Sequence, residues 1–108
     1  MGKDIFKPNK MSETKHVHPW FKKELLKRWP KAFVYKPPAG RYGRKGVHDF
    51  LLCIDGKFIS VEAKLPDNEM TPMQVDIKVK IEEAGGLSLC LKGKDESIFD
   101  RISEWLKD

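Results

Sequence analysis

Residues 47–64 read VHDFLLCIDGKFISVEAK, and this stretch decides the fold. Two runs rich in apolar residues are joined here by Asp55 and Gly56. An Asp-Gly pair between two such runs is typical of a type I′ turn, in which both central residues adopt positive φ. The sequence therefore predicts a β-hairpin with strands over 47–54 and 57–64.

The register of this hairpin brings three charged side chains together. A two-residue turn fixes the pairing, so Asp49 falls opposite Glu62, with Cβ atoms expected about 5 Å apart. Lys64 returns to the same face two residues later. Opposed carboxylates are unfavourable unless a proton or a cation lies between them, and Mg²⁺ prefers carboxylate oxygens. The pattern predicts a metal held by Asp49 and Glu62, with the ammonium of Lys64 beside it to orient or deprotonate water, or to stabilise developing phosphorane charge.

The alternative interpretation of these three residues is an exposed sheet face that carries a diagonal Lys–Glu pair. On spacing alone this alternative has equal weight. His48 points to the opposite face from Asp49 in the same register, which favours a structural role for its ring over a role as a ligand.

Three helices and two further strands are predicted around the hairpin. The two strands cover 32–35 and 87–92. The first helix covers 18–29 and is opened by His18-Pro19, and the second covers 72–84 and is capped by Thr71, with Gln74 in capping-box position. A last helix is capped by Asp95 or Ser97. A crossover helix between two strands favours their parallel pairing. The fold class is therefore α/β, with a mixed central sheet flanked by helices in the order αβββαβα. Residues 1–15 are expected to form a flexible basic arm, and residues 16–108 a single domain.

Charge is unevenly distributed along the 108 residues. The net charge is +5, yet residues 16–46 contain nine Lys or Arg and only one acidic residue. This segment ends in a Gly-rich and Pro-rich loop that contains Arg41, Arg44 and Lys45. Such a segment favours a polyanionic partner, and the alternative is a solvated basic face.

Several classes of protein are excluded by composition. No apolar run approaches the length of about 20 residues that a membrane span needs, and residues 1–15 lack the apolar stretch of a secretory signal. The two cysteines, Cys53 and Cys90, are too few for a disulfide framework, so we expect free, buried thiols in a reducing cytoplasm.

Four segments resemble the VRR-NUC branch of the PD-(D/E)XK nuclease superfamily. Asp49 followed by Glu62-Ala63-Lys64 is similar to the D…ExK signature of the superfamily. The context resembles the branch over roughly residues 20–92, in Gly43–Asp49 (GRKGVHD), Ser60–Lys64 (SVEAK), Thr71–Gln74 (TPMQ) and Gly85-Gly86. His48 departs from the pattern, because many relatives have proline at that position.

This resemblance implies a restriction-endonuclease-like core that cleaves nucleic acid with Mg²⁺ or Mn²⁺. Asp49 and Glu62 look like metal ligands, the backbone carbonyl of Ala63 like a third ligand, and Lys64 like the catalytic lysine. Gln74 looks like the helix residue that borders the site, although it can also simply close the capping box. Relatives often place a glutamate of the first helix near the metal, and here that residue would be Glu24. The alternative for Glu24 is an i,i+4 pair with Arg28.

The resulting hypothesis is a metal-dependent endodeoxyribonuclease, selective for branched DNA such as Holliday junctions. Small stand-alone members of the branch are typically viral or bacterial homodimers, so we expect a homodimer in the cytoplasm, or in the host cytoplasm if the protein is viral. Arg41, Arg44 and Lys45 are expected to contact phosphates, and Trp105 on the last helix is a candidate for the dimer face. One alternative is a non-catalytic nucleic-acid-binding module that retains a nuclease core. The other is a small basic protein whose charged side chains only keep its surface hydrated and bind no specific partner.

Overall fold

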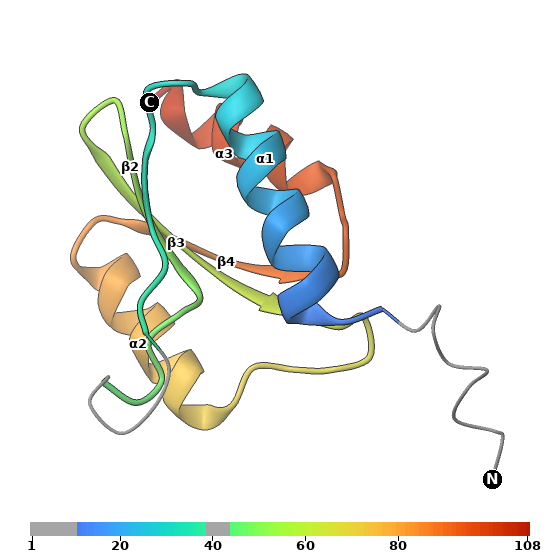
Figure 1. Cartoon of the computed structure of the whole chain (residues 1–108). Coiled ribbons are helices and arrows are strands. Elements are labelled where there is room, and N and C mark those ends of the chain that lie inside the picture. Colours follow the sequence, from blue (N-terminus) through green and yellow to red (C-terminus); the bar gives the residue numbers. More distant parts are fainter. Residues whose placement is uncertain (1–10, 39–43) are drawn as a thin grey trace, which may run out of the picture.

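The computed structural model describes residues 11–38 and 44–108 (Figure 1). Its elements in chain order are the π-helical turn η2 (Glu13–Val17), α1 (His18–Arg28), β1 (Phe33–Tyr35), β2 (Phe50–Ile54), β3 (Lys57–Lys64), α2 (Pro72–Glu83), β4 (Leu87–Lys92) and α3 (Ser97–Leu106). Helical structure therefore begins at Glu13, inside the segment predicted as an arm, and residues 1–10 lie outside the described part. Within the described ranges, no helix is both long and apolar enough to cross a membrane.

The predicted hairpin is present with the expected register. Strands β2 and β3 are antiparallel, with Ile54 opposite Lys57 and Phe50 opposite Val61. The turn residues Asp55 and Gly56 have φ values of 52° and 79°, as a type I′ turn requires. One difference is that β2 begins at Phe50 rather than at residue 47, so the ladder ends just before Asp49.

The sheet has four strands in the order β1-β2-β3-β4. Strand β1 is antiparallel to β2, whereas β3 and β4 are parallel, with α2 as the crossover between them. Helices α1 and α3 lie together on one face, and α2 lies apart from them on the other side of the sheet (Figure 1). The predicted mixed α/β architecture is thus confirmed.

The main core lies between the sheet and the α1/α3 layer. Along β2 and β3 every second side chain is apolar and faces the helices. The largest core side chains with almost no exposure, from the strands and the helices together, are Phe21, Leu25, Phe50, Leu52, Ile59, Leu91, Ile98 and Ile102. Strand alternation therefore leaves the even-numbered residues of β3 on the α2 side. Glu62 and Lys64 belong to that second set.

Helix α2 buries less of its surface than its apolar stripe predicts. Ile77 is buried, but Met73 is 54% exposed and Ala84 is exposed as well. The aromatic rings of Phe33, Tyr35 and Phe58 are also exposed, at 66%, 47% and 43%. Phe33 and Tyr35 are paired in register with Cys53 and Leu51, so they share the α2 side of the sheet beyond the part that α2 covers.

The cysteines differ from expectation in one respect. Both are free, as predicted, but Cys53 is exposed and Cys90 is half-buried. Cys53 is exposed because it lies on the α2 side of β2, the side opposite the main core, whereas its neighbours Leu52 and Ile54 face that core. A residue inside an apolar run of a strand is therefore buried only if another element covers the face of the sheet on which its side chain lies.

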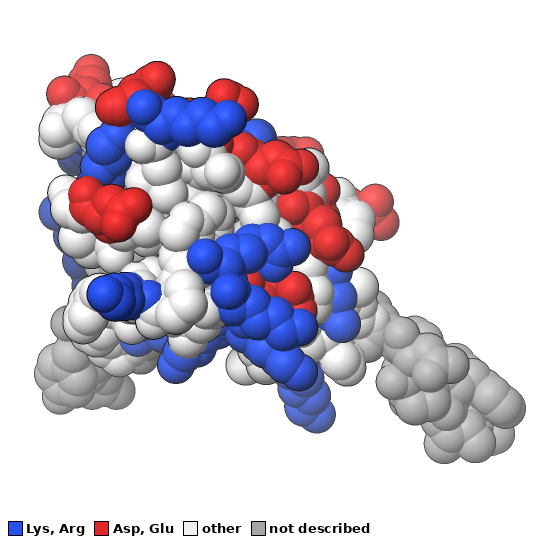
Figure 2. Space-filling view, turned by 90° about the horizontal axis from the view of Figure 1, so that it is seen from above, with Lys and Arg blue, Asp and Glu red and all other residues white. Residues whose placement is uncertain are grey.

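Basic side chains gather on the outer surface of the helical layer. Figure 2 shows Lys and Arg side chains concentrated in the lower middle of the face seen from above, with most acidic side chains toward its upper edge. Helix α1 contributes four exposed cations, Lys22, Lys23, Lys27 and Arg28. Of the nine basic residues in segment 16–46, the eight that the structure describes are all exposed.

Gly46 lets the chain pass close to the first turn of α2, and Gly46→Ala should lower the free energy of unfolding by about 2–4 kcal/mol. Its φ is +84°, and an added Cβ would lie 2.6 Å from the backbone oxygen of Met73. Chemical denaturation measures the loss. Gly85→Ala is the matched control, because Gly85 has φ +97° but open space around it. Equal losses in the two variants would show that the close approach to α2 contributes nothing.

Candidate functional site

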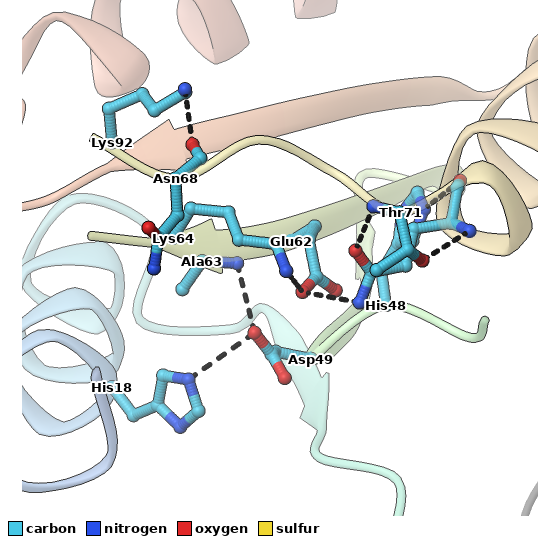
Figure 3. Close-up of polar contacts among 10 residues, drawn as sticks. His18, His48, Asp49, Glu62, Ala63, Lys64, Asn68, Thr71 and Lys92 are labelled. Carbon is cyan, nitrogen blue, oxygen red and sulfur yellow. Dashed lines mark hydrogen bonds and ion pairs between the residues drawn. The ribbon is translucent and has the colours of Figure 1, made fainter. Parts of the chain in front are cut away.

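Asp49 and Glu62 meet at the end of the β2–β3 ladder (Figure 3). The Oδ2 atom of Asp49 accepts a hydrogen bond from the backbone N–H of Ala63 at 2.9 Å. Because β2 begins only at Phe50, this carboxylate takes the place of the backbone partner that Ala63 would otherwise have. In an extended strand the N–H and C=O of a residue point the same way, so the Ala63 carbonyl also faces the side of Asp49.

Glu62 is a buried carboxylate whose negative charge is only partly balanced by hydrogen bonds and a nearby cation. It is 3% exposed, and its Oε2 accepts a hydrogen bond of 3.0 Å from Gln74 and lies 3.7 Å from the Nζ of Lys64. Its Oε1 is buried and has no hydrogen-bond partner among the described residues. Burial, reinforced by the negative charge of Asp49, raises the pKa of Glu62 from 4.5 to about 7, against the opposing effect of Lys64.

Gln74 makes the capping-box hydrogen bonds of α2 and also contacts Glu62. Its Oε1 accepts a hydrogen bond from the backbone N–H of Thr71 at 2.9 Å, and the hydroxyl of Thr71 accepts one from the N–H of Gln74 at 3.2 Å. This reciprocal pair is the predicted capping box of α2. The Nε2 of the same side chain donates to Glu62. The helix cap therefore holds the amide in the orientation that contacts the carboxylate.

His48 is fully buried between the sheet and α2. Both of its ring nitrogens contact protein atoms, and His48 is not part of the group of potential metal ligands among the described residues. Its Nε2 lies 2.8 Å from the backbone oxygen of Gln74, and its Nδ1 lies 2.9 Å from the hydroxyl of Ser60. A carbonyl only accepts, so the proton is assigned to Nε2, and Nδ1 is an acceptor that faces the hydroxyls of Ser60 and Ser88. Burial lowers the pKa of this ring. A neutral His48 therefore ties the start of β2 to β3 and to the first turn of α2, in agreement with the structural role expected for it. The predicted face is wrong, however: His48 contacts Ser60, so it lies on the same side of the sheet as Glu62, because the ladder ends at Phe50 and strand alternation does not continue to residue 48.

Two further residues reach Asp49 that the sequence analysis did not single out. Glu13 in η2 and His18 at the start of α1 each place a ligand atom within 4.8 Å of one another and of the Asp49 carboxylate. The Nε2 of His18 lies 3.3 Å from Oδ2 of Asp49. The only local signal was His18-Pro19, which predicts a helix start, and nothing near it in sequence indicates that this start faces residue 49.

Glu24 contacts other partners. Its carboxylate oxygens lie 3.0 Å from a guanidinium nitrogen of Arg28 and 3.3 Å from the Nζ of Lys27. The hydrogen bond from Arg28, followed by that from Lys27, lowers the pKa of Glu24. These contacts correspond to the helical ion pair that was the alternative for Glu24. The first helical segment instead brings Glu13 toward the two acidic residues of the hairpin.

The basic residues predicted to contact phosphates lie in the loop before Asp49. Arg44 and Lys45 are exposed. Arg41 lies outside the described residues. Arg44 also lines a groove with Val47, Leu51 and Phe58 on the α2 side of the sheet.

The donors that converge here fit a divalent cation. Asp49 and Glu62 supply carboxylates, and the Oε1 of Glu62 is buried without a partner. Both ring nitrogens of His18 are likewise buried and make no hydrogen bond within the part of the chain that the structure describes. Buried polar atoms are normally hydrogen-bonded, so these unsatisfied atoms are available to a cation. Among the described residues the ligand atoms of Glu13, His18 and Asp49 lie within 4.8 Å of one another, and Glu62 is not part of that cluster.

No protein-family model matches the sequence, and a search of curated proteins finds no relative. The fold does have a counterpart among solved structures. It is similar to a structure described as a VRR_NUC domain, with a TM-score of 0.58 and 17% sequence identity, over 85% of this chain and 96% of that one. With nearly all of that domain covered, the fold of this chain is that of a VRR_NUC domain.

Proposed function

We propose that the protein is a metal-dependent endonuclease of the PD-(D/E)XK type that hydrolyses DNA phosphodiester bonds. The observation that carries this proposal is the buried, incompletely compensated Glu62 beside Asp49, with the ammonium of Lys64 next to it. A buried carboxylate whose charge is not balanced lowers the free energy of unfolding, and a cation bound between the two acids removes that destabilisation. The VRR_NUC fold supports the same conclusion.

The residues divide into ligands and supporting groups. Asp49, Glu62 and the backbone carbonyl of Ala63 would hold Mg²⁺ or Mn²⁺. When bound, such an ion polarises a phosphodiester and lowers the pKa of water. Lys64 would orient the water or stabilise the charge that develops on the phosphorus oxygens. Gln74 is a positioning residue that fixes Glu62 through a hydrogen bond. We do not include Glu24, because its carboxylate pairs with Arg28 and Lys27.

The substrate that we propose is branched DNA such as a Holliday junction. Arg41, Arg44 and Lys45 would contact phosphates, and phosphate contacts position a strand without reading its sequence. The basic surface of α1 supports a polyanionic partner of this kind (Figure 2). Recognition would therefore rest on the shape of the nucleic acid.

We also propose a homodimer, which would present two sites to opposite strands of a junction. The exposed rings of Phe33, Tyr35 and Phe58 favour the α2 side of the sheet as the dimer face. Trp105 is a weaker candidate, since its ring packs against the core and beneath the Nζ of Lys57. Sedimentation equilibrium would test the dimer. The free cysteines suit the reducing cytoplasm that we propose as its location.

Arg44→Ala should weaken DNA binding about equally for all sequences and lower the slope of log K against log salt concentration by about one unit. The reason is that one phosphate contact releases about one condensed counterion. Fluorescence anisotropy over a salt series measures the slope. Lys107→Ala serves as the control, because Lys107 is also exposed but lies at the end of α3, outside the basic segment 16–46. An unchanged slope for Arg44→Ala would remove Arg44 from the phosphate contacts.

The proposed activity is tested with four-way junction, flap and linear duplex DNA, each incubated with Mg²⁺, Mn²⁺ or EDTA. We expect metal-dependent nicks at symmetrical positions in the junction. Equal cleavage of all three substrates would retain the nuclease and contradict the selectivity for branched DNA. Binding without cleavage under every metal condition would contradict the enzyme and favour a non-catalytic nucleic-acid-binding module. Neither binding nor cleavage would favour a basic protein without a nucleic-acid partner.

A further inference from the structure

His18 is a buried imidazole whose surroundings do not satisfy it. The side chain is 8% exposed, and neither ring nitrogen makes a hydrogen bond among the described residues. Its Nε2 lies 3.3 Å from the Oδ2 of Asp49 without the geometry of a hydrogen bond. Phe50 packs edge-on against the ring, with centroids 5.2 Å apart, and restricts its orientation. A ring held in place and unsatisfied is not explained by packing alone.

The atoms around this ring match a metal-ligand set. Glu13, His18 and Asp49 each offer one ligand atom, and these atoms lie within 4.8 Å of one another. Two ligands at right angles around an ion with bonds of about 2.1 Å are about 3 Å apart, close to the separation of the His18 and Asp49 atoms. Each of the three comes from a different segment, η2, α1 and the residue before β2. The cluster is thus a product of tertiary structure.

We propose that His18, together with Glu13 and Asp49, coordinates a divalent transition metal and gives the site a preference for Mn²⁺ over Mg²⁺. This proposal rests on the proposed function in one respect, because it shares Asp49 with the nuclease site. The chemistry is that an imidazole nitrogen suits first-row transition metals, whereas Mg²⁺ prefers oxygen ligands. His18 thereby adds a selectivity that two carboxylates and a carbonyl do not provide.

The test measures metal binding in the absence of DNA, by titration calorimetry with Mn²⁺ and with Mg²⁺. His18→Gln should weaken Mn²⁺ binding about tenfold or more and Mg²⁺ binding less than about threefold, because the amide oxygen can still serve Mg²⁺. Electron spin-echo envelope modulation of Mn²⁺ bound to the wild type should report a directly coordinated nitrogen, which His18→Gln should lose. His16→Gln is the control for the loss of an imidazole. His16 is exposed in η2, and its Nδ1 accepts a hydrogen bond from the backbone N–H of Ser12 at 2.8 Å, which a glutamine amide oxygen can also accept, so this variant should change neither property.

A second variant keeps the test decisive if His18→Gln fails to fold. Glu13→Gln should weaken the binding of both metals while the nitrogen signal persists, because only a carboxylate is lost. Nitrogen coupling absent from wild-type Mn²⁺, or equal losses of Mn²⁺ and Mg²⁺ affinity in His18→Gln, would overturn the proposal. Those results are compatible with metal-dependent cleavage, so they leave the nuclease intact. A wild type that binds neither ion would overturn both.

Discussion

Lys64→Ala should reduce metal-dependent cleavage at least about 1000-fold while DNA binding falls only slightly. The Nζ of Lys64 lies 3.7 Å from Glu62, and the side chain is only 13% exposed, so its charge acts in a partly dehydrated site. A preorganised cation at the position of developing negative charge contributes several kcal/mol to the barrier, which corresponds to this loss. Asp49→Asn should abolish cleavage to a similar extent, because it removes a ligand charge. Single-turnover kinetics measure the loss of cleavage, and fluorescence anisotropy measures DNA binding separately.

Lys92→Ala is the matched control for the loss of one positive charge. Lys92 lies beside Lys64 in the β3–β4 register, and its Nζ pairs with Glu69 at 2.9 Å. We expect this variant to lower DNA affinity as much as Lys64→Ala and to cleave at close to the wild-type rate. If Lys64→Ala lost binding and cleavage in parallel, Lys64 would belong to the DNA-binding surface, and its assignment as the catalytic lysine would be wrong.

Glu62→Gln should abolish cleavage and at the same time stabilise the metal-free protein at pH 8 by about 1–3 kcal/mol. The folded state raises the pKa of Glu62 from 4.5 to about 7. A group whose pKa is raised on folding contributes stability below its unfolded value and loses that contribution as pH rises through its folded value. At pH 8 the wild type therefore carries an unfavourable buried charge, which glutamine removes while it still accepts from Gln74.

The stability difference between Glu62→Gln and the wild type should disappear as the pH falls from about 7 to about 4.5. Denaturation in EDTA at a series of pH values measures it, and the comparison cancels the opposite contribution of His48, whose pKa is lowered by burial. Glu69→Gln is the control, because this carboxylate is 84% exposed and should change neither stability nor cleavage. A loss of stability in Glu62→Gln at pH 8 would mean that the charge of Glu62 stabilises the fold.

The local chemistry of the sequence was sufficient for the order of the three α-helices and four strands and for the central hairpin, although it missed η2 and placed the start of β2 three residues too early. Asp55-Gly56 determines a tight turn, and the turn determines the register, so residues 49, 62 and 64 could be grouped without coordinates. Thr71 and Gln74 predicted their capping box in the same way. These are interactions between near neighbours in the chain or across one turn, for which spacing is enough.

The extent of burial was less predictable. The apolar stripe of α2 predicted a wider buried face, and the apolar surroundings of Cys53 predicted a buried thiol. Cys53 lies on a part of the sheet face that α2 does not cover, and Met73 and Ala84, at the two ends of α2, are exposed because only the middle of the helix, at Ile77, is buried. Periodicity identifies which residues share a face, but it does not reveal whether another element of this chain covers that face.

By itself the sequence determined the hairpin, its register and the grouping of two acids with a lysine, because a two-residue turn leaves no freedom in the pairing. Only the tertiary structure decided that Glu13 and His18 converge on Asp49, and that His48 links Gln74 to the sheet. Those contacts join residues 26 or more positions apart in the chain, through the packing of helices on both faces. Such packing depends on the shape of the whole core, which no local pattern encodes.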